Sequence, residues 1–306
     1  MNAEYKEIFK KPEIDYSIVT REELRKKFYD RYYEYYNIFL KVMDGEYKER
    51  LAQVCERFEY ILDLFLSQRE HKTDDFPYLG SYRILYKMFD SEIGFLNFIT
   101  ESTDKRDHEL SGITIREKKD IDNERIIFGV INKSITYNVI RVLALEKEKK
   151  GEPFKIPKEV SEYSDRFYRI EDCAINYLTN LMGTDIYTYY FNGKGREFEQ
   201  RLFGLFKDAL NYLPECQDEV NEYYEERKAQ NQKVTRNMIL NEMAMGYLRN
   251  MESYLDAKSN TMVEADFYDF SANCDKLLRG QKLKREIENE DPNNIEEISK
   301  SKKGLK

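Results

Sequence analysis

Residues 49–65 read ERLAQVCERFEYILDLF, and this stretch decides the fold class of the chain. Its apolar side chains recur three or four positions apart, at Leu51, Val54, Cys55, Phe58, Ile61, Leu62 and Phe65. That spacing places them on one face of an α-helix, with the charged residues on the remaining surface. We therefore expect an amphipathic helix whose core positions include Leu51, Phe58, Ile61 and Phe65.

The same period recurs along most of the chain. Further helices are expected over residues 20–44, 78–100, 123–149, 158–182, 198–213, 215–228, 235–255 and 265–289, with a short aromatic segment at 185–191, and Thr20 with Glu23 forms a capping box at the first of them. Only 6 Pro and 13 Gly interrupt 306 residues, which is too few for a sandwich or barrel of many short strands. The sequence predicts an all-α fold of about nine mostly antiparallel helices in one or two packed bundles, with at most a short strand at residues 113–115.

The best candidate for a domain boundary is the cluster of Gly151, Pro153 and Pro157. We expect an N-terminal arm over residues 1–19, a helical bundle over 20–150 and a second bundle over 151–289. Residues 290–306 are expected to form a disordered tail.

Composition and charge suggest a cytoplasmic protein. The chain has no basic and apolar leader at its start and no apolar run long enough to cross a bilayer, so neither secretion nor membrane insertion is expected. Its four cysteines lie far apart without a CxxC pair or a nearby His, which argues against disulfides and zinc. The formal net charge of −8 repels phosphate backbones unless basic residues gather locally.

The two histidines argue against two helical enzyme classes. HEPN-type RNases place an arginine before the histidine with a spacer of four to six residues, and neither His71 nor His108 has an arginine at that spacing. Gln68 and Lys105 also stand where Glu would complete the Glu-x-x-His pairs of di-iron bundles. We expect both histidines to be solvated, and no catalytic residue, metal ligand or cofactor site is assigned.

One short turn carries a weak signal for anion binding. Lys194 follows Gly193 as in a phosphate loop, but Gly195 replaces the hydroxyl residue that would hold magnesium. Lys194 and Arg196 could still present cations to an anion at a helix N-terminus, while the alternative is a flexible loop between helices.

Two other groups of cations could contact nucleic acid. Lys233 and Arg236 belong to a segment, residues 233–240, that faintly resembles the second helix of ribbon-helix-helix DNA-binding proteins, although no strand pattern precedes Pro214. The alternative for this segment is a capped amphipathic helix. The second group is the acid-free run that contains Lys276, Arg279, Lys282, Lys284 and Arg285. Its alternative role is to balance acidic side chains within the protein.

Acidic and aromatic side chains mark two helices. Within residues 215–228, Asp218, Glu222 and Glu225 share one helical face, and Glu215, Glu219 and Glu226 share another. Such faces can bind a divalent cation but are usually solvated. The aromatic residues of 28–39 extend too far around their helix to be entirely core. We therefore consider Tyr29, Tyr33 and Tyr36 as a protein interface, with a buried seam as the alternative.

These observations favour a non-catalytic helical protein that binds another protein as an adaptor, inhibitor or structural accessory. A phage or mobile-element origin is a hypothesis from composition alone. The first alternative is a nucleic-acid-binding accessory or regulator that would use Lys194, Arg196, Lys233, Arg236, Lys282, Lys284 and Arg285. The second alternative is an enzyme that uses carboxylate, Lys or Tyr chemistry. The sequence identifies neither the partner nor the oligomeric state.

Overall fold

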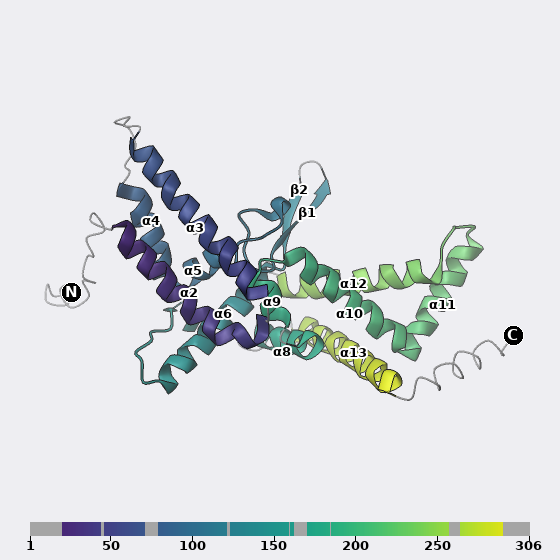
Figure 1. Cartoon of the computed structure of the whole chain (residues 1–306). Coiled ribbons are helices and arrows are strands. Elements are labelled where there is room, and N and C mark those ends of the chain that lie inside the picture. Colours follow the sequence, from purple (N-terminus) through teal and green to yellow (C-terminus); the bar gives the residue numbers. More distant parts are fainter. Residues whose placement is uncertain are drawn as a thin grey trace, which may run out of the picture. The chain divides into compact units, whose positions relative to one another are not determined.

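The computed structural model describes residues 20–43, 46–70, 79–120, 123–158, 160–161, 170–183, 185–256 and 264–289 (Figure 1). The described residues contain eleven α-helices and one two-stranded sheet, which confirms the all-α class. Every helix in this described part is too short or too polar to span a membrane. The chain divides into two compact units, Met1–Ile99 and Thr100–Lys306.

The first unit is a group of four helices around an aromatic core. Its helices are α2 (Arg21–Met43), α3 (Glu46–Glu70), α4 (Leu79–Asp90) and α5 (Glu92–Ile99). The rings of Phe28 on α2 and Phe58 on α3 stack with centroids 4.0 Å apart, and Phe89 and Phe98 pack around them. The apolar period of residues 49–65 thus places Phe58 in the core, as expected.

The start of α2 confirms the predicted capping box. The backbone N–H of Thr20 donates to the Glu23 carboxylate at 2.9 Å, and the N–H of Glu23 donates to the Thr20 hydroxyl at 3.2 Å. Each residue therefore satisfies a backbone donor of the other at the helix N-terminus.

The second unit contains a helical bundle and a short sheet. Its elements are the 3-10 turn η2 (Lys105–Asp107), β1 (Ile115–Asp120), β2 (Asn123–Ile127), α6 (Gly129–Lys149), α8 (Ile170–Met182), α9 (Asp185–Phe191), α10 (Gly195–Tyr212), α11 (Pro214–Ala229), α12 (Arg236–Asp256) and α13 (Glu264–Asn289). Helix α10 packs on both α12 and α13. Gly280 makes the approach of α13 possible, because a Cβ there would lie 2.4 Å from the Ala209 carbonyl oxygen of α10.

The hairpin β1–β2 corrects the predicted start of the next helix. Residues 123–127 were expected to be helical, but they form a strand that pairs antiparallel with β1, Ile115 opposite Ile127. Phe128 then adopts a left-handed conformation (φ 63°), so α6 begins only at Gly129. Pairing with the preceding strand overrides helical periodicity here.

Two further expectations need correction. The helix expected over residues 78–100 is two helices, α4 and α5, interrupted at Ser91. Leu51 and Ile61 are only partly buried, whereas Val54 and Leu62 share the core with Phe58. The side chain of Phe65 lies outside the described part.

The expected domain division is not tested by this structure. The two compact units are divided between Ile99 and Thr100. The expected boundary at residue 150/151 concerns independent folding, so it stays a prediction. The arm over 1–19, the tail over 290–306 and His71 lie outside the described residues.

Candidate functional site

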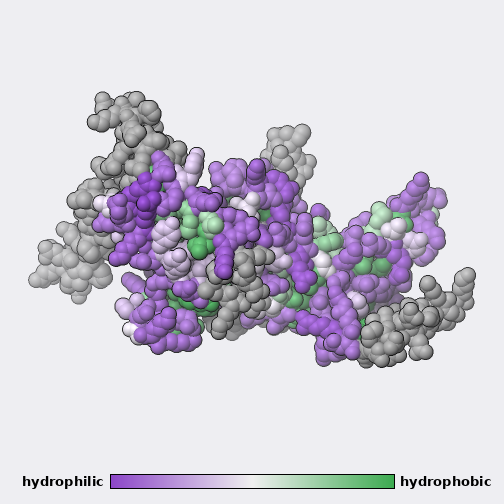
Figure 2. Space-filling model, viewed as in Figure 1, coloured by the Kyte–Doolittle hydropathy of each residue, from purple (hydrophilic) through white to green (hydrophobic). Residues whose placement is uncertain are grey.

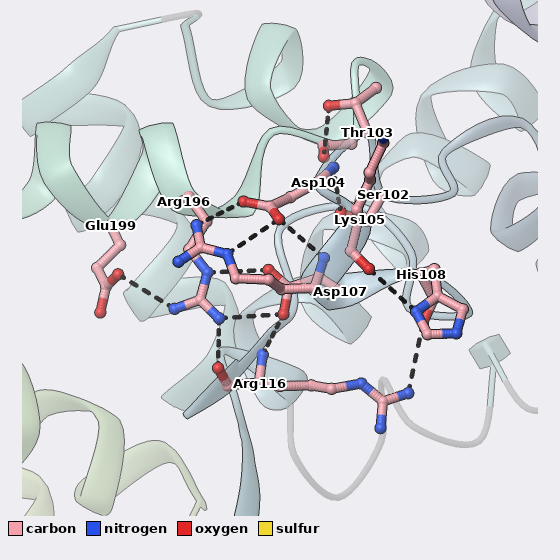
Figure 3. Close-up of polar contacts among 11 residues, drawn as sticks. Ser102, Thr103, Asp104, Lys105, Asp107, His108, Arg116, Arg196 and Glu199 are labelled. Atoms are coloured by element: carbon pink, nitrogen blue, oxygen red, sulfur yellow. Dashed lines mark hydrogen bonds and ion pairs between the residues drawn. The ribbon is translucent and has the colours of Figure 1, made fainter. Parts of the chain in front are cut away.

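A cluster of polar side chains surrounds Asp107 (Figure 3). Asp107 ends the turn η2 and is 0% exposed. Its carboxylate accepts two hydrogen bonds from the Arg196 guanidinium, at 2.9 and 3.1 Å, and one from the backbone N–H of Arg116. The cluster thus joins η2, β1 and the first turn of α10.

The Asp107–Arg196 ion pair also binds backbone groups of β1. Arg196 also donates to the backbone carbonyl of Arg116, whose N–H is held by Asp107. The two side chains therefore satisfy the N–H and C=O of one residue, as a neighbouring strand would. An unpaired strand edge would otherwise leave these groups open.

This geometry suits a structural role better than catalysis. A general base needs a carboxylate within hydrogen-bonding reach of a substrate, and Asp107 is enclosed and already accepts three hydrogen bonds. His108 is exposed, and its Nδ1 lies 3.1 Å from the Lys105 carbonyl oxygen. In the described part of the chain, no group of three or more His, Cys, Asp or Glu residues is placed to hold a metal ion.

Two carboxyl groups at the rim of the cluster have shifted pKa values. Hydrogen bonds from the Arg106 side chain and backbone lower the pKa of Asp104 to about 2. Burial raises the pKa of Glu199, although the Arg196 guanidinium opposes this shift. Asp104 caps η2 through the Arg106 N–H, so its ionised form supports the turn.

The turn before α10 packs closely against the segment that precedes η2. Gly193 has a φ of 61°, and a Cβ there would lie 2.3 Å from the backbone oxygen of Glu101. The turn is thus packed against residues 101–102, and an anion contact by Lys194 and Arg196 stays a prediction. Lys194 lies 3.5 Å from Glu197, and Arg196 is held by Asp107. These two predicted cations therefore have carboxylate partners within the protein.

The predicted basic run on α13 also has internal partners. Lys276 lies 3.8 Å from Glu219 on α11, Arg279 contacts Glu215, and Lys284 donates to Asp208 on α10 at 2.6 Å. Lys282 lies 3.8 Å from Glu286 along the same helix. Arg285 is exposed, and no ion pair to it is found among the described residues. Much of this run therefore balances acids of the bundle.

Lys233 and Arg236 are exposed around the connection between α11 and α12. Arg236 donates to the Gln217 side chain at 3.2 Å. The hydroxyl of Thr235 accepts the N–H of Met238 at 3.2 Å, as in a capped helix start. The ribbon-helix-helix resemblance fails, because α10 runs to Tyr212 where a strand would be needed.

The three tyrosines proposed as an interface lie in different environments. Tyr36 is only 2% exposed and stacks on the buried Tyr32 with ring centroids 4.1 Å apart, so it belongs to the core. Tyr33 is 48% exposed, and Tyr29 is partly buried beside it. Burial raises the pKa of Tyr29 to about 12. The Tyr29 hydroxyl is thus neutral at pH 7. Tyr33 offers an accessible ring.

Sequence reasoning missed Asp107, the centre of the polar cluster. An isolated Asp in a charged connection gives no signal, and Arg196 lies 89 positions away. The ion pairs between α11 and α13 were indicated by the spacing of charged residues in the sequence. Glu215 and Glu219 repeat at a helical interval, as do Lys276 and Arg279.

Comparison with protein-family models, with curated proteins and with solved structures found no match.

Proposed function

We propose that this chain is a non-catalytic helical protein that binds another protein as an adaptor, inhibitor or structural accessory. The observation that carries the proposal is the Tyr29–Tyr33 pair on α2. The two rings stack with centroids 6.5 Å apart, and the outer ring, Tyr33, is 48% exposed.

The core holds this aromatic pair in place. Tyr29 packs edge-on against Phe58 with centroids 6.2 Å apart, and Tyr33 packs edge-on against Tyr32 at the same distance. A ring fixed before binding loses little conformational entropy when a partner covers it. Tyrosine on a rigid helix is therefore a suitable anchor for a protein interface.

A largely hydrophilic surface fits an interface with few anchors. On the face shown in Figure 2, hydrophilic residues predominate and hydrophobic ones form small separate patches. Binding energy at such surfaces concentrates in a few central aromatic residues. The nucleic-acid alternative is less well supported, because Lys276, Arg279 and Lys284 have carboxylate partners inside the bundle.

The test uses a photo-crosslinking amino acid at Tyr33 in the full-length protein. A native-host lysate is irradiated with and without nuclease treatment. We expect a crosslinked protein at position 33 that survives nuclease. The matched control is position 60 on α3, where Tyr60 is 65% exposed.

The size of the effect is then measured with the captured partner. Tyr33→Ala should weaken binding by about 2 kcal/mol or more if Tyr33 is a central anchor. Tyr60→Ala should leave the affinity nearly unchanged. Crosslinks that nuclease abolishes, or equal losses in both variants, would contradict the proposed interface.

A further inference from the structure

The two outer edges of the hairpin β1–β2 differ in how their backbone groups are bound. At the edge of β1, the N–H of Arg116 donates to Asp107, and the C=O of Arg116 accepts from Arg196 (Figure 3). Asp107 is fully buried, so these contacts belong to the folded interior. Side chains of the protein thus occupy the edge of β1 at this position, where a further strand would otherwise pair.

No such cover is found on the outer edge of β2 in the described chain. Ile126 lies opposite Arg116 in the antiparallel ladder. Opposite residues of such a ladder either both direct their backbone groups between the strands or both direct them outward. Those of Arg116 point outward, so the N–H and C=O of Ile126 point outward too, as do those of Glu124 two positions earlier. No hydrogen bond to these groups of Glu124 or Ile126 is found among the described residues.

The side chains along this edge are accessible as well. Ile126 is 51% exposed, and the Glu124 side chain is exposed to the same extent. The two lie on one face of the hairpin, because they are two positions apart. Solvent-facing strand edges are often protected by Lys or Pro, and residues 123–127 contain neither. Figure 1 shows the hairpin projecting from the helices of the second unit.

We propose that the outer edge of β2 binds an extended segment of a partner protein as a third strand. An extended backbone offers N–H and C=O groups at the two-residue interval that separates Glu124 from Ile126. Antiparallel pairing, which is slightly the more stable arrangement, brings the segment past Ile126 first and Glu124 second. The segment then carries an aliphatic residue opposite Ile126, any residue next, and Lys or Arg opposite Glu124.

A second copy of this chain fits the edge less well. Two β2 strands paired antiparallel about Arg125 would place the two Arg125 side chains opposite each other, and like charges in that position destabilise a sheet. Pairing centred on Ile126 would instead bring Glu124 opposite Phe128, which has left the strand with a φ of 63°. The edge therefore favours a different sequence as its occupant.

The probe is a fluorescently labelled peptide with Val-Thr-Lys at its centre and Thr and Ser on both sides. Its anisotropy is followed on titration with the full-length protein. One further peptide is N-methylated at Val, whose N–H would face β2, and another at the central Thr, whose N–H would face solvent. Methylation at Val should weaken binding about two- to tenfold more than methylation at Thr, as loss of a hydrogen bond implies.

Variants of the protein test the two side chains. Ile126→Ala should weaken binding by about two- to fivefold, which is the usual range for a cross-strand pair. Its matched control is Leu145→Ala on α6, which removes an aliphatic side chain of similar exposure (55%) and should leave affinity unchanged. Glu124→Gln should reduce the salt dependence of binding, whereas Glu148→Gln, at an exposed position of α6, should not. Circular dichroism melts confirm that each variant is folded.

Four outcomes would overturn the proposal. They are absence of binding by the unmethylated peptide, equal losses from the two methylated peptides, equal losses in Ile126→Ala and Leu145→Ala, and self-association that Ile126→Ala abolishes. The last would identify a second copy of this chain as the occupant. If Ile126→Ala fails to fold, the methylated peptides still decide. The hairpin belongs to the second unit and Tyr33 to the first, so the two surfaces are tested separately.

Discussion

Single aromatic residues hold the first unit together. Phe58 is fully buried, and its ring has four aromatic neighbours with centroids within 6.4 Å: Phe28, Tyr29, Phe89 and Phe98. These neighbours come from α2, α4 and α5, so one side chain on α3 links all four helices. Its removal would leave a cavity that rigid surrounding rings cannot easily fill.

Phe58→Ala is therefore expected to lower the free energy of unfolding by about 3–5 kcal/mol. Urea denaturation followed by circular dichroism measures the change. The matched control is Tyr60→Ala two positions along α3, where an exposed ring is removed and the change should stay within about 0.5 kcal/mol. An unchanged midpoint for Phe58→Ala would show that this face of α3 is not the core.

Burial of Glu199 predicts a pH-dependent contribution to stability. Because burial raises the pKa of Glu199 in the folded protein, its ionised form is disfavoured relative to the unfolded chain. The stability that this carboxyl contributes is full below its ordinary pKa of 4.5 and is lost as pH rises through its folded-state pKa. Glu199→Gln should thus match the native protein in acid and be the more stable of the two at neutral pH. Urea denaturation of both proteins at pH values from acid to neutral tests the sign of this stability difference. If Glu199→Gln is less stable than the native protein at neutral pH, the Arg196 contact outweighs the effect of burial.

At the scale of elements, the connection between α9 and α10 depends on one close backbone approach. Gly193 combines a positive φ with a separation of 2.3 Å between its would-be Cβ and the Glu101 oxygen. Gly183 has a similar φ of 68°, but nothing lies within 4 Å of its would-be Cβ. Comparing substitutions at the two glycines therefore separates the cost of backbone strain from the cost of a steric clash.

Gly183→Ala is expected to cost only the left-handed penalty, about 1–2 kcal/mol. Gly193→Ala should cost clearly more, because residues 101–102 must also move away. Thermal melts of the two variants give the comparison directly. Equal losses in the two variants would mean that the segment before η2 is not held tightly against this turn.

At the scale of the whole molecule, ion pairs within the protein reduce the positive charge that a partner can contact. The chain carries a net charge of −8, and the cations of α13 are largely engaged with α10 and α11. A net negative charge repels phosphate backbones unless cations gather locally. We therefore expect weak binding to duplex and single-stranded nucleic acid.

Electrophoretic mobility shifts at about 0.15 M salt should show no tight complex, since affinity falls by roughly 0.9 log units per phosphate contact for each decade of salt. Lys282→Glu with Arg285→Glu is the informative variant, because both residues are exposed and neither supports α10. Tight binding that this variant abolishes would favour the nucleic-acid alternative. Lys284 is avoided because its contact with Asp208 is part of the bundle.

The sequence by itself determined the helices and much of their core. The period around Phe58 and the capping box at Thr20 are local patterns, and local patterns suffice when each helix has one apolar face to bury. Tertiary structure alone decided the features that join distant residues: the Asp107–Arg196 pair, the approach of Gly193 to Glu101, and the cover of Glu219 by Lys276. It also decided that residues 123–127 form a strand and that Tyr36 is buried while Tyr33 is not. These outcomes depend on which surfaces meet in space, because a side chain's burial and charge partners are set by neighbours that the local sequence does not contain.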